Sequence, residues 1–373
     1  RLTRIATKDG HAIECHYDER RRMCRVIDSG GRQLRFVYDN RDKLREIWLP
    51  HETEGSIRFL KYSIDESEDL VRVTDVLGHS QTLAYKDHLL VKETDRTGLS
   101  FYFQYDGNNP FAKCVRTWGN GGIFDHLIHY DEPNRKTFVV NSLGACTVYQ
   151  RDELGQIIAV TDPMQKTARY AYDPESGQEA SVIDPLGRET KREFDARGNV
   201  VAIVQADGTR IVFEYENDRP VRVVDEIGVE WRFEYNDAGR IRRVTDPVGA
   251  ETNYQWKRGL LRSVRDAMGA VIEYDYDRAK NVHKVKYPNG GDERFVHDVC
   301  GRVIEFRDPL GGMTKCKRDA CGRIIEVFEP DGNHRRMKYD AEGNVIEAID
   351  HARHIEIQVF ADEHGAVIHL EIG

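Results

Sequence analysis

The sequence of 373 residues contains no long apolar run and no dense patch of one charge. No stretch approaches the roughly 18 consecutive apolar residues of a membrane-spanning helix, and the first residues have no apolar segment typical of a signal peptide. The net charge of -9 comes from interleaved acidic and basic residues, without the clustered basic face that grips phosphate. We therefore expect no membrane span and no nucleic-acid partner.

The cysteines also lack the pattern of a disulfide framework. There are seven, an odd number, and no Cys-x-x-Cys pair occurs among them. A framework of disulfides would show an even number at regular spacing, so we expect the chain to fold in a reducing cytoplasm. They are Cys15, Cys24, Cys114, Cys146, Cys300, Cys316 and Cys321.

A repeat runs through the whole chain instead. Tyr-Asp pairs begin at Tyr17, Tyr38, Tyr105, Tyr130, Tyr172, Tyr276 and Tyr339. Degenerate forms fall between them, at Tyr62, Tyr85, Arg151, Phe194, Tyr215, Tyr235, Trp256, His297, Arg318 and Phe360. The pattern recurs about every 21 residues, about sixteen times, which is the signature of a tandem-repeat architecture.

Two turns alternate within each repeat. One is a Tyr-Asp-x-x-Gly corner, as at 339–343, and the other is an Asp-Pro-x-Gly corner, as at 184–187 and 246–249. The aspartate accepts a bond from the backbone two residues on, and the glycine supplies the positive φ that closes the turn. Turns about ten residues apart leave room for strands and none for helices.

The strands before the first corner end in an aromatic-x-aromatic pattern, as in Phe213-x-Tyr215 and Tyr274-x-Tyr276. Residues two apart share a strand face, so we expect these aromatics to stack from repeat to repeat as a ladder. The following strands carry a stripe of isoleucine and valine, as at Ile325 and Val327. The ladder and the stripe are predicted to stabilise the fold together.

The length of such a sheet forces it to bend. Two strands per repeat, each about 4.8 Å wide, give a strip about 150 Å long and about 20 Å across. Twisted sheets seldom exceed about ten strands without curling, and a single turn of this strip would surround a space about 50 Å wide. The sequence predicts an all-β fold, a long curled or spiralling antiparallel sheet with a hollow side.

The pattern of residues 235–249 resembles the YD repeat of the Rhs (rearrangement hotspot) proteins, over essentially the whole chain. The segment from Cys114 to Asp125 is similar to a stretch of Rhs effectors of bacterial type VI secretion systems. In that family, YD repeats form a hollow β-cocoon around a C-terminal toxin. The resemblance implies a toxin domain as partner, with a secretion component and an immunity protein. It also implies synthesis in the bacterial cytoplasm followed by secretion.

The chain also departs from the family. In family effectors the repeats are followed by a core whose aspartates cut off the toxin. This sequence shows no such motif after its repeats, so no protease aspartates can be assigned from the resemblance. We expect residues 1–373 to be one YD-repeat array, cut within a repeat at both ends. The resemblance then implies a structural shell segment of an Rhs-type polymorphic toxin. The alternative is a surface adhesion or carbohydrate-binding strip with the same repeats.

The search for chemistry ends without a catalytic, cofactor-binding or metal-binding residue, and we expect no enzyme. The recurring aspartates are explained as turn caps, with calcium at stacked corners as a minor alternative. Cys300, Cys316, Cys321 and His297 offer a conceivable zinc site, or a Cys300–Cys321 disulfide, at spacings that match no known zinc finger.

Two further patterns are explained structurally. The pairs His126/His129 and His351/His354 are predicted to be solvent or turn histidines. Gly119-Asn120-Gly121-Gly122 is predicted to be a hairpin turn, because no Gly-Lys-Ser/Thr and no helix follow it.

Overall fold

The computed structural model describes residues 1–350, 355–361 and 367–372, and the side chains of residues 1–350. In this part of the chain 35 strands form one antiparallel sheet, in which each strand pairs with the next one along the chain. Within these described residues the one helical element is a short 3-10 turn, η1 (Asn120–Gly122). The prediction of an all-β, curled antiparallel sheet is confirmed.

The strands have the following bounds. The first twelve are β1 (Arg4–Ala6), β2 (Ala12–Tyr17), β3 (Met23–Asp28), β4 (Gln33–Tyr38), β5 (Leu44–His51), β6 (Gly55–Ile64), β7 (Leu70–Asp75), β8 (Ser80–Lys86), β9 (Leu89–Thr94), β10 (Ser100–Tyr105), β11 (Cys114–Gly119) and β12 (His126–Asp131). The next twelve are β13 (Lys136–Asn141), β14 (Cys146–Arg151), β15 (Ile157–Thr161), β16 (Thr167–Tyr172), β17 (Glu179–Ile183), β18 (Glu189–Phe194), β19 (Val200–Val204), β20 (Arg210–Glu216), β21 (Arg219–Val224), β22 (Glu230–Tyr235), β23 (Ile241–Thr245) and β24 (Glu251–Lys257). The others are β25 (Leu260–Arg265), β26 (Val271–Tyr276), β27 (Val282–Lys286), β28 (Asp292–His297), β29 (Val303–Arg307), β30 (Met313–Arg318), β31 (Ile324–Phe328), β32 (His334–Tyr339), β33 (Val345–Asp350), β34 (Ile355–Ala361) and β35 (Val367–Ile372).

Both corner types are built on one turn. In the Asp246 corner the aspartate N–H donates to the Ala250 carbonyl at 2.9 Å, and Gly249 N–H donates to the Asp246 carbonyl at 3.0 Å. Asp246 Oδ1 also accepts from the amides of Val248 and Ala250. The Asn236 corner repeats this arrangement with Gly239 and Arg240. The predicted role of these aspartates as turn caps is confirmed.

The two corners lie on opposite edges of the strip. We call the turns from odd-numbered to even-numbered strands P corners, and the turns from even-numbered to odd-numbered strands YD corners. Most YD corners follow a β-bulge, as between Glu234 and Tyr235. In the third such corner the bulge lies between Ser63 and Ile64, so the Tyr-equivalent residue is Ile64 and the assignment of Tyr62 is wrong. Phe360 lies in a strand whose side chains are not described.

The tyrosines stabilise the sheet by hydrogen bonds rather than by stacking. Within residues 1–350, nine of them reach back to a backbone carbonyl of the preceding repeat, as Tyr235 Oη donates to Pro220 O at 2.8 Å and Tyr276 Oη to Leu261 O at 2.9 Å. Trp256 Nε1 makes the same bond with Ile241 O. Among the described residues no ring pair joins the repeat aromatics of successive repeats. The ladder prediction is wrong because equivalent residues lie two strands apart, about 9.6 Å.

These hydroxyl bonds occur where strand pairing between repeats is short. Strands β15 and β16 pair over three residues next to their P corner, whereas β16 and β17 pair over four residues next to their YD corner. Toward the YD edge the hydroxyl of Tyr172 donates to the carbonyl of Ile157 at 2.8 Å, which gives that carbonyl a partner.

The sheet is a single layer and has almost no core. Among residues 1–350 the buried apolar side chains are Cys15, Ala202 and Val285, and the buried polar ones are Ser100 and Asn333. The isoleucine and valine stripe is only half-buried. Backbone pairing, capped corners and tyrosine bonds therefore contribute most of the order, together with many cross-strand ion pairs such as Arg222 with Glu230 at 2.7 Å.

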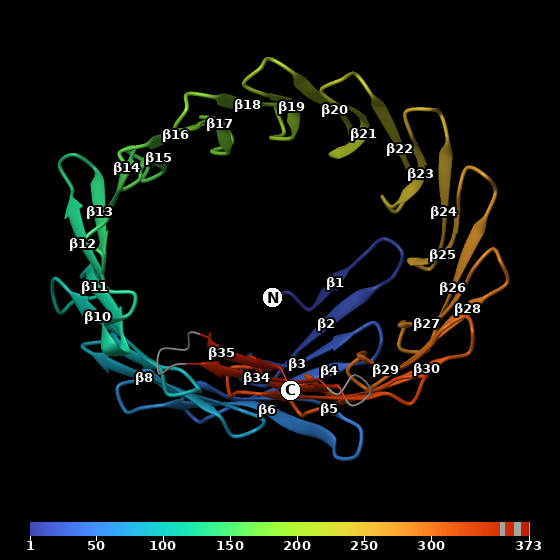
Figure 1. Cartoon of the computed structure of the whole chain (residues 1–373), viewed down its shortest axis with the longest axis horizontal. Helices are drawn as coiled ribbons and strands as arrows, with labels where there is room; N and C mark the ends of the chain where they lie inside the picture. Colours follow the sequence, from blue (N-terminus) through green and yellow to red (C-terminus); the bar gives the residue numbers. More distant parts are fainter. Residues whose placement is uncertain (351–354, 362–366, 373) are drawn as a thin grey trace.

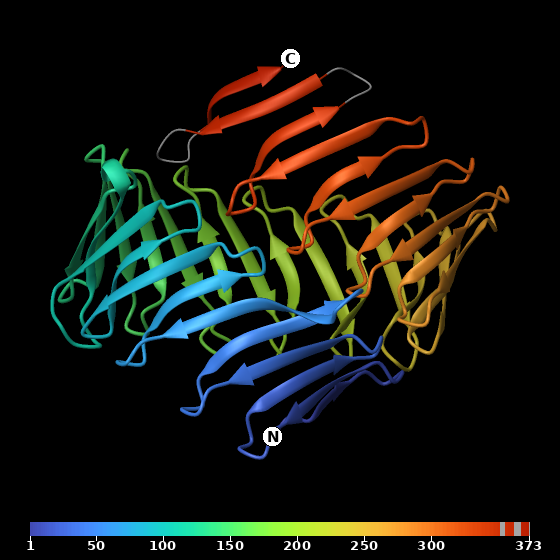
Figure 2. The same cartoon turned by 90° about the horizontal axis from the view of Figure 1, so that it is seen from below.

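The strip winds into a spiral that overlaps itself. Figure 1 shows a ring of strands around an open centre, and Figure 2 shows strands β1–β5 and β27–β33 at different levels. Arg96 bonds Glu342, 246 residues further on, and Cys300 bonds Pro50 across 250 residues. One turn therefore takes about twelve repeats, a circumference of about 115 Å and a width of about 37 Å. The expected width of 50 Å was too large because it spread the whole chain over a single turn.

Candidate functional site

The feature that closes the wall is a seam between successive turns. P corners of β1–β10 face YD corners of β22–β33, so opposite edges of the same strip meet. The contacts join residues separated by more than two hundred positions in the sequence. The seam is the candidate functional site because it converts a ribbon into a continuous wall.

The first seam contact is an ion pair. Arg240 Nε, at the YD corner of β22–β23, donates to Asp9 Oδ2 at 2.5 Å, and the Asp9 side chain is 13% exposed. The Arg240 guanidinium, aided by the Thr7 hydroxyl, lowers the pKa of Asp9 from 3.8 to about 2. The next YD corner also contributes, because His11 Nε2 lies 3.0 Å from the Arg258 carbonyl. This end of the seam is held by a charged pair that stays ionised at neutral pH.

The second contact depends on a glycine. A Cβ on Gly30 would lie 2.5 Å from the carbonyl oxygen of Ala279, so no larger residue fits there without a shift. Beside it, Arg32 is held by Asp28 at 2.6 Å. Its guanidinium reaches Asn281 Oδ1 at 3.4 Å and Cys300 O at 3.5 Å. Close backbone approach and one shared arginine therefore join the β3–β4 corner to two YD corners.

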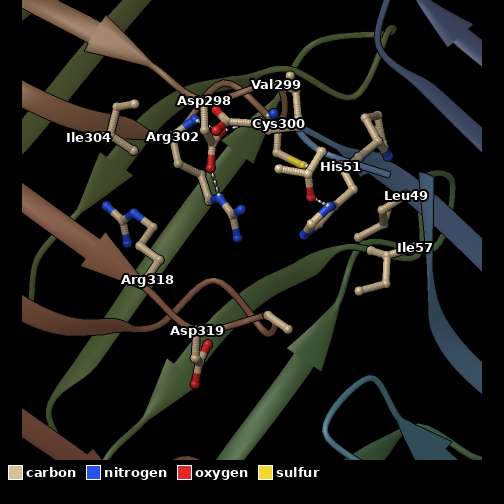
Figure 3. Close-up of a pocket in the computed structure, with 14 residues that line it drawn as sticks. Leu49, His51, Ile57, Asp298, Val299, Cys300, Arg302, Ile304, Arg318 and Asp319 are labelled. Atoms are coloured by element: carbon tan, nitrogen blue, oxygen red, sulfur yellow. Dashed lines mark hydrogen bonds and ion pairs between the residues drawn. The ribbon is translucent and has the colours of Figure 1, made fainter. Parts of the chain in front are cut away.

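The third contact surrounds a cavity of about 310 Å³, which Figure 3 shows in close-up. Leu49 and His51 come from β5 and Ile57 comes from β6, whereas Val299 and Cys300 come from the YD corner of β28–β29. The cavity is therefore a gap in the seam between two turns.

Chemistry in this cavity is limited by the state of its thiol. Cys300 Sγ donates to the Pro50 carbonyl at 3.5 Å, and burial raises the pKa of the thiol. The His51 ring is engaged by Thr53 at 3.2 Å. Asp298 is paired with Arg302 at 2.6 Å and caps its own turn. A protonated thiol that is packed against a backbone carbonyl makes a packing contact rather than a nucleophile.

The last described contact is again charged. Arg96, in the P corner of β9–β10, donates its backbone amide to Glu342 Oε1 at 2.6 Å and a guanidinium nitrogen to Oε2 at 3.2 Å. The same guanidinium lies 3.8 Å from Asp75. The two ends of the described seam are therefore ion pairs, and the middle is packed.

The predicted zinc and calcium alternatives find no support in the described residues. All seven cysteines are free thiols, so Cys300 and Cys321 form no disulfide. No group of three or more metal-binding side chains gathers anywhere in the described part. His297 faces Asp277 at 3.9 Å, and the YD-corner aspartates bind their own backbone.

The segment that resembles type VI effectors lies at a short strand pairing in the sheet. Strands β11 and β12 pair at only two residues. Arg116 holds Asp125 through two bonds of 2.9 and 2.7 Å and lies over the Trp118 ring, which stacks on Tyr102 at 5.5 Å. Gly119 has no room for a Cβ, which would lie 2.5 Å from Ile123. The predicted hairpin turn at 119–122 does connect two strands, through η1.

Of the two histidine pairs, His126/His129 lies within the described residues. His126 bonds the Phe124 carbonyl at 2.7 Å next to its turn, and the ring of His129 lies 5.9 Å from that of Phe138. His351 and His354 lie outside the described residues. No helix in the described part is long and apolar enough to span a membrane.

Sequence reasoning did not find the seam residues, because pairs such as Asp9 and Arg240 carry no periodic signal across more than two hundred residues. One signal was available. Cys300 and Cys321 occupy the same position in successive repeats, just before the turn glycine, and both line the seam. Both cysteines therefore pack at corners that meet another turn.

The geometry defines a class of protein, a YD-repeat sheet wound into a wall. A family model described as the teneurin YD-shell matches residues 185–311. The chain is 26% identical over 225 residues to "Toxin protein Tse5" of Pseudomonas aeruginosa strain PAO1, covering 54% of this chain and 17% of the relative. It is 25% identical over 215 residues to "Probable deoxyribonuclease RhsA" of Dickeya dadantii strain 3937, covering 57% of this chain and 12% of the relative.

Solved structures show the same fold. The structure of TcdB2-TccC3-TEV matches with a TM-score of 0.53 at 10% identity, covering 96% of this chain and 24% of that one. That of TcdB2-TccC3-Cdc42 matches with a TM-score of 0.51 at 12% identity, covering 93% and 24%. These matches support an Rhs/YD-repeat family protein. It spans less than a fifth of the length of either curated relative.

Proposed function

We propose that this chain is a section of the shell of an Rhs-type polymorphic toxin, which encloses a C-terminal toxin domain until delivery into a target cell. The observation that carries the proposal is the seam. A ribbon that bonds to itself across 246 residues surrounds an open space (Figure 1), which a complete shell would separate from solvent. One relative is named a toxin protein and another a probable deoxyribonuclease, and two structures with this fold come from TcdB2-TccC3 assemblies.

The role proposed for the chain itself is structural rather than catalytic. Its seam cavity holds a protonated thiol, and its YD-corner aspartates cap their own turns. The enclosed toxin domain would be its main partner, with a secretion component and an immunity protein acting on the complete toxin. Synthesis in the bacterial cytoplasm and export by type VI secretion belong to this proposal.

The test measures whether the wall shields a cargo. The complete shell is co-expressed with its toxin domain, and the rate at which a protease digests that domain is compared with and without the shell. We expect strong protection with the shell. A matched arm carries Arg240→Glu, which places two carboxylates together at the seam and should raise the digestion rate. Equal digestion with and without the shell refutes the proposal.

The adhesion alternative gains no specific support from the described side chains. The repeat tyrosines are part-buried, and their hydroxyls are bonded to backbone carbonyls, as at Tyr215 and Tyr339. Rings held in this way offer little free face for stacking on sugars. Saturable binding of one glycan class by the isolated strip would favour the adhesion alternative over the shell proposal.

A further inference from the structure

A groove follows the seam between the two turns of the spiral. Beside the cavity of about 310 Å³ near Cys300, two further cavities of about 430 and 400 Å³ lie between the turns. Neighbouring cavities adjoin, because the 400 and 430 Å³ cavities share Ile13 and Arg32, and the 430 and 310 Å³ cavities share Leu49 and Cys300. We call the three together the seam groove. It extends from β1 to β6, about 24 Å.

The middle of the seam groove has an apolar floor. Five consecutive strands, β2 to β6, each contribute one apolar side chain to it: Ile13, Val26, Leu34, Leu49 and Phe59. Cys300 and Cys321, from two YD corners of the next turn, line the same cavity. The floor is open to solvent, since Ile13 is 42% exposed and Leu34 is 36% exposed. Contiguous apolar side chains in a cavity of this size are typical of a binding site for a small molecule.

The charged side chains around the groove leave one cation in excess. Three aspartates that line it are each paired with an arginine of their own corner: Asp28 with Arg32, Asp298 with Arg302 and Asp319 with Arg323. At the end near Leu49, Glu52 and Arg318 carry opposite charges. At the other end Lys280, from the turn between β26 and β27, makes no ion pair within residues 1–350. An anionic group is therefore favoured at the Lys280 end.

The backbone along the groove favours an acyl chain over a peptide as the ligand. Strands β2 to β6 pair with one another, the Asp28 corner closes its own turn, and the Pro50 carbonyl accepts from Cys300 Sγ. A peptide in the groove would therefore bury N–H and C=O groups of its own without partners, which is costly. An acyl chain carries no such groups. Its length is about 15 Å, half of the hydrocarbon core of a bilayer, so it fits within the groove.

We propose that the seam groove binds a long-chain fatty acid, with the acyl chain on the apolar side chains of β2–β6 and the carboxylate at Lys280. A ligand in this position contacts the first turn through residues such as Leu34 and the second turn through Cys300 and Cys321. Its binding therefore stabilises the seam as well. This inference goes beyond the shell role, because the groove lies in the wall itself and does not depend on what the wall encloses.

The first test measures binding to the whole chain by isothermal titration calorimetry. The ligand is hexadecanoate, kept below the concentration at which it forms micelles. We expect saturable binding of one molecule per chain. Hexadecan-1-ol, which has the same chain and no charge, should bind about fivefold more weakly because it forms no ion pair with Lys280. Binding of hexadecanoate that is undetectable, or that saturates only at many molecules per chain, overturns the inference.

Three variants locate the ligand on the chain. Leu34→Asp places a carboxylate on the floor of the groove and should weaken hexadecanoate binding at least tenfold. Leu310→Asp makes the same change at a corner where the side chain is 97% exposed, and it should leave binding unchanged. Lys280→Gln should weaken hexadecanoate about fivefold and leave hexadecan-1-ol unchanged. Equal binding by Leu34→Asp and Leu310→Asp overturns the proposed site, and equal binding of hexadecanoate by Lys280→Gln and the unchanged chain overturns the place of the carboxylate.

The second test uses the thiols of the unchanged chain as reporters, so it needs no variant to fold. Alkylation by iodoacetamide is followed at each cysteine by mass spectrometry. Cys300 and Cys321 line the groove, whereas Cys146 lies in β14 and serves as the internal control. With hexadecanoate at about ten times its Kd, we expect alkylation of Cys300 and Cys321 to slow about tenfold and that of Cys146 to stay unchanged. Equal slowing at all three thiols, or slowing at none, overturns the inference.

Discussion

The ion pair between Asp9 and Arg240 should control how readily the first hairpin leaves the wall. The fall in the pKa of Asp9 from 3.8 to about 2 corresponds to about 2.5 kcal/mol at most. Thr7 supplies part of that shift, and the 27% exposure of Arg240 allows screening by solvent. We therefore expect a coupling of about 1 kcal/mol between the two side chains.

A double-mutant cycle with Asp9→Asn and Arg240→Gln isolates this coupling, because the contact of Arg240 with the Trp256 ring is lost equally in both arms. The assay is amide exchange in β1 and β2, where β1 pairs only with β2. Asp207→Asn is the matched control, a pre-glycine aspartate that binds Thr209 within its own corner. A coupling below about 0.3 kcal/mol, or an equal effect of Asp207→Asn, would refute the reasoning.

Three further outcomes follow from the same contacts. Tyr235→Phe removes the bond to the Pro220 carbonyl and should cost about 1 kcal/mol, seen as faster exchange in β21 and β22, while an unchanged rate would contradict the role given to the hydroxyl. Gly30→Ala should cost about 1–3 kcal/mol by overpacking against Ala279 in denaturant unfolding, whereas Leu310→Ala on the uncovered edge should be neutral. The lowered pKa values of Asp9, Glu230 and Asp292, each about 2, stabilise the fold above their ordinary values of 3.8 to 4.5. That stability should be lost as the pH falls from about 4 to 2, and a flat unfolding midpoint over this range would disprove it.

Local chemistry was predictable from the sequence and distant contacts were not. The repeat, both corners and the capping role of residues such as Asp246 follow from turn chemistry that acts within five residues. The ladder prediction failed because equivalent tyrosines lie two strands apart, too far to stack. The carbonyl that each hydroxyl reaches depends on where strand pairing between repeats stops, which no residue pattern marks. The seam depends on how many repeats complete one turn. That number is set by small curvatures added over about 24 strands, and no single residue encodes it.

The distance along the chain between seam partners has a consequence for biosynthesis. Hairpins such as β2–β3 pair locally and are complete as soon as their residues are made, but Asp9 meets Arg240 only 231 residues later. At translation speeds of about 5–20 residues per second, that interval is roughly 12 to 46 seconds. For that time the nascent sheet is an open ribbon with two free edges. The ring of strands around the open centre (Figure 1) closes only when the second turn reaches the first.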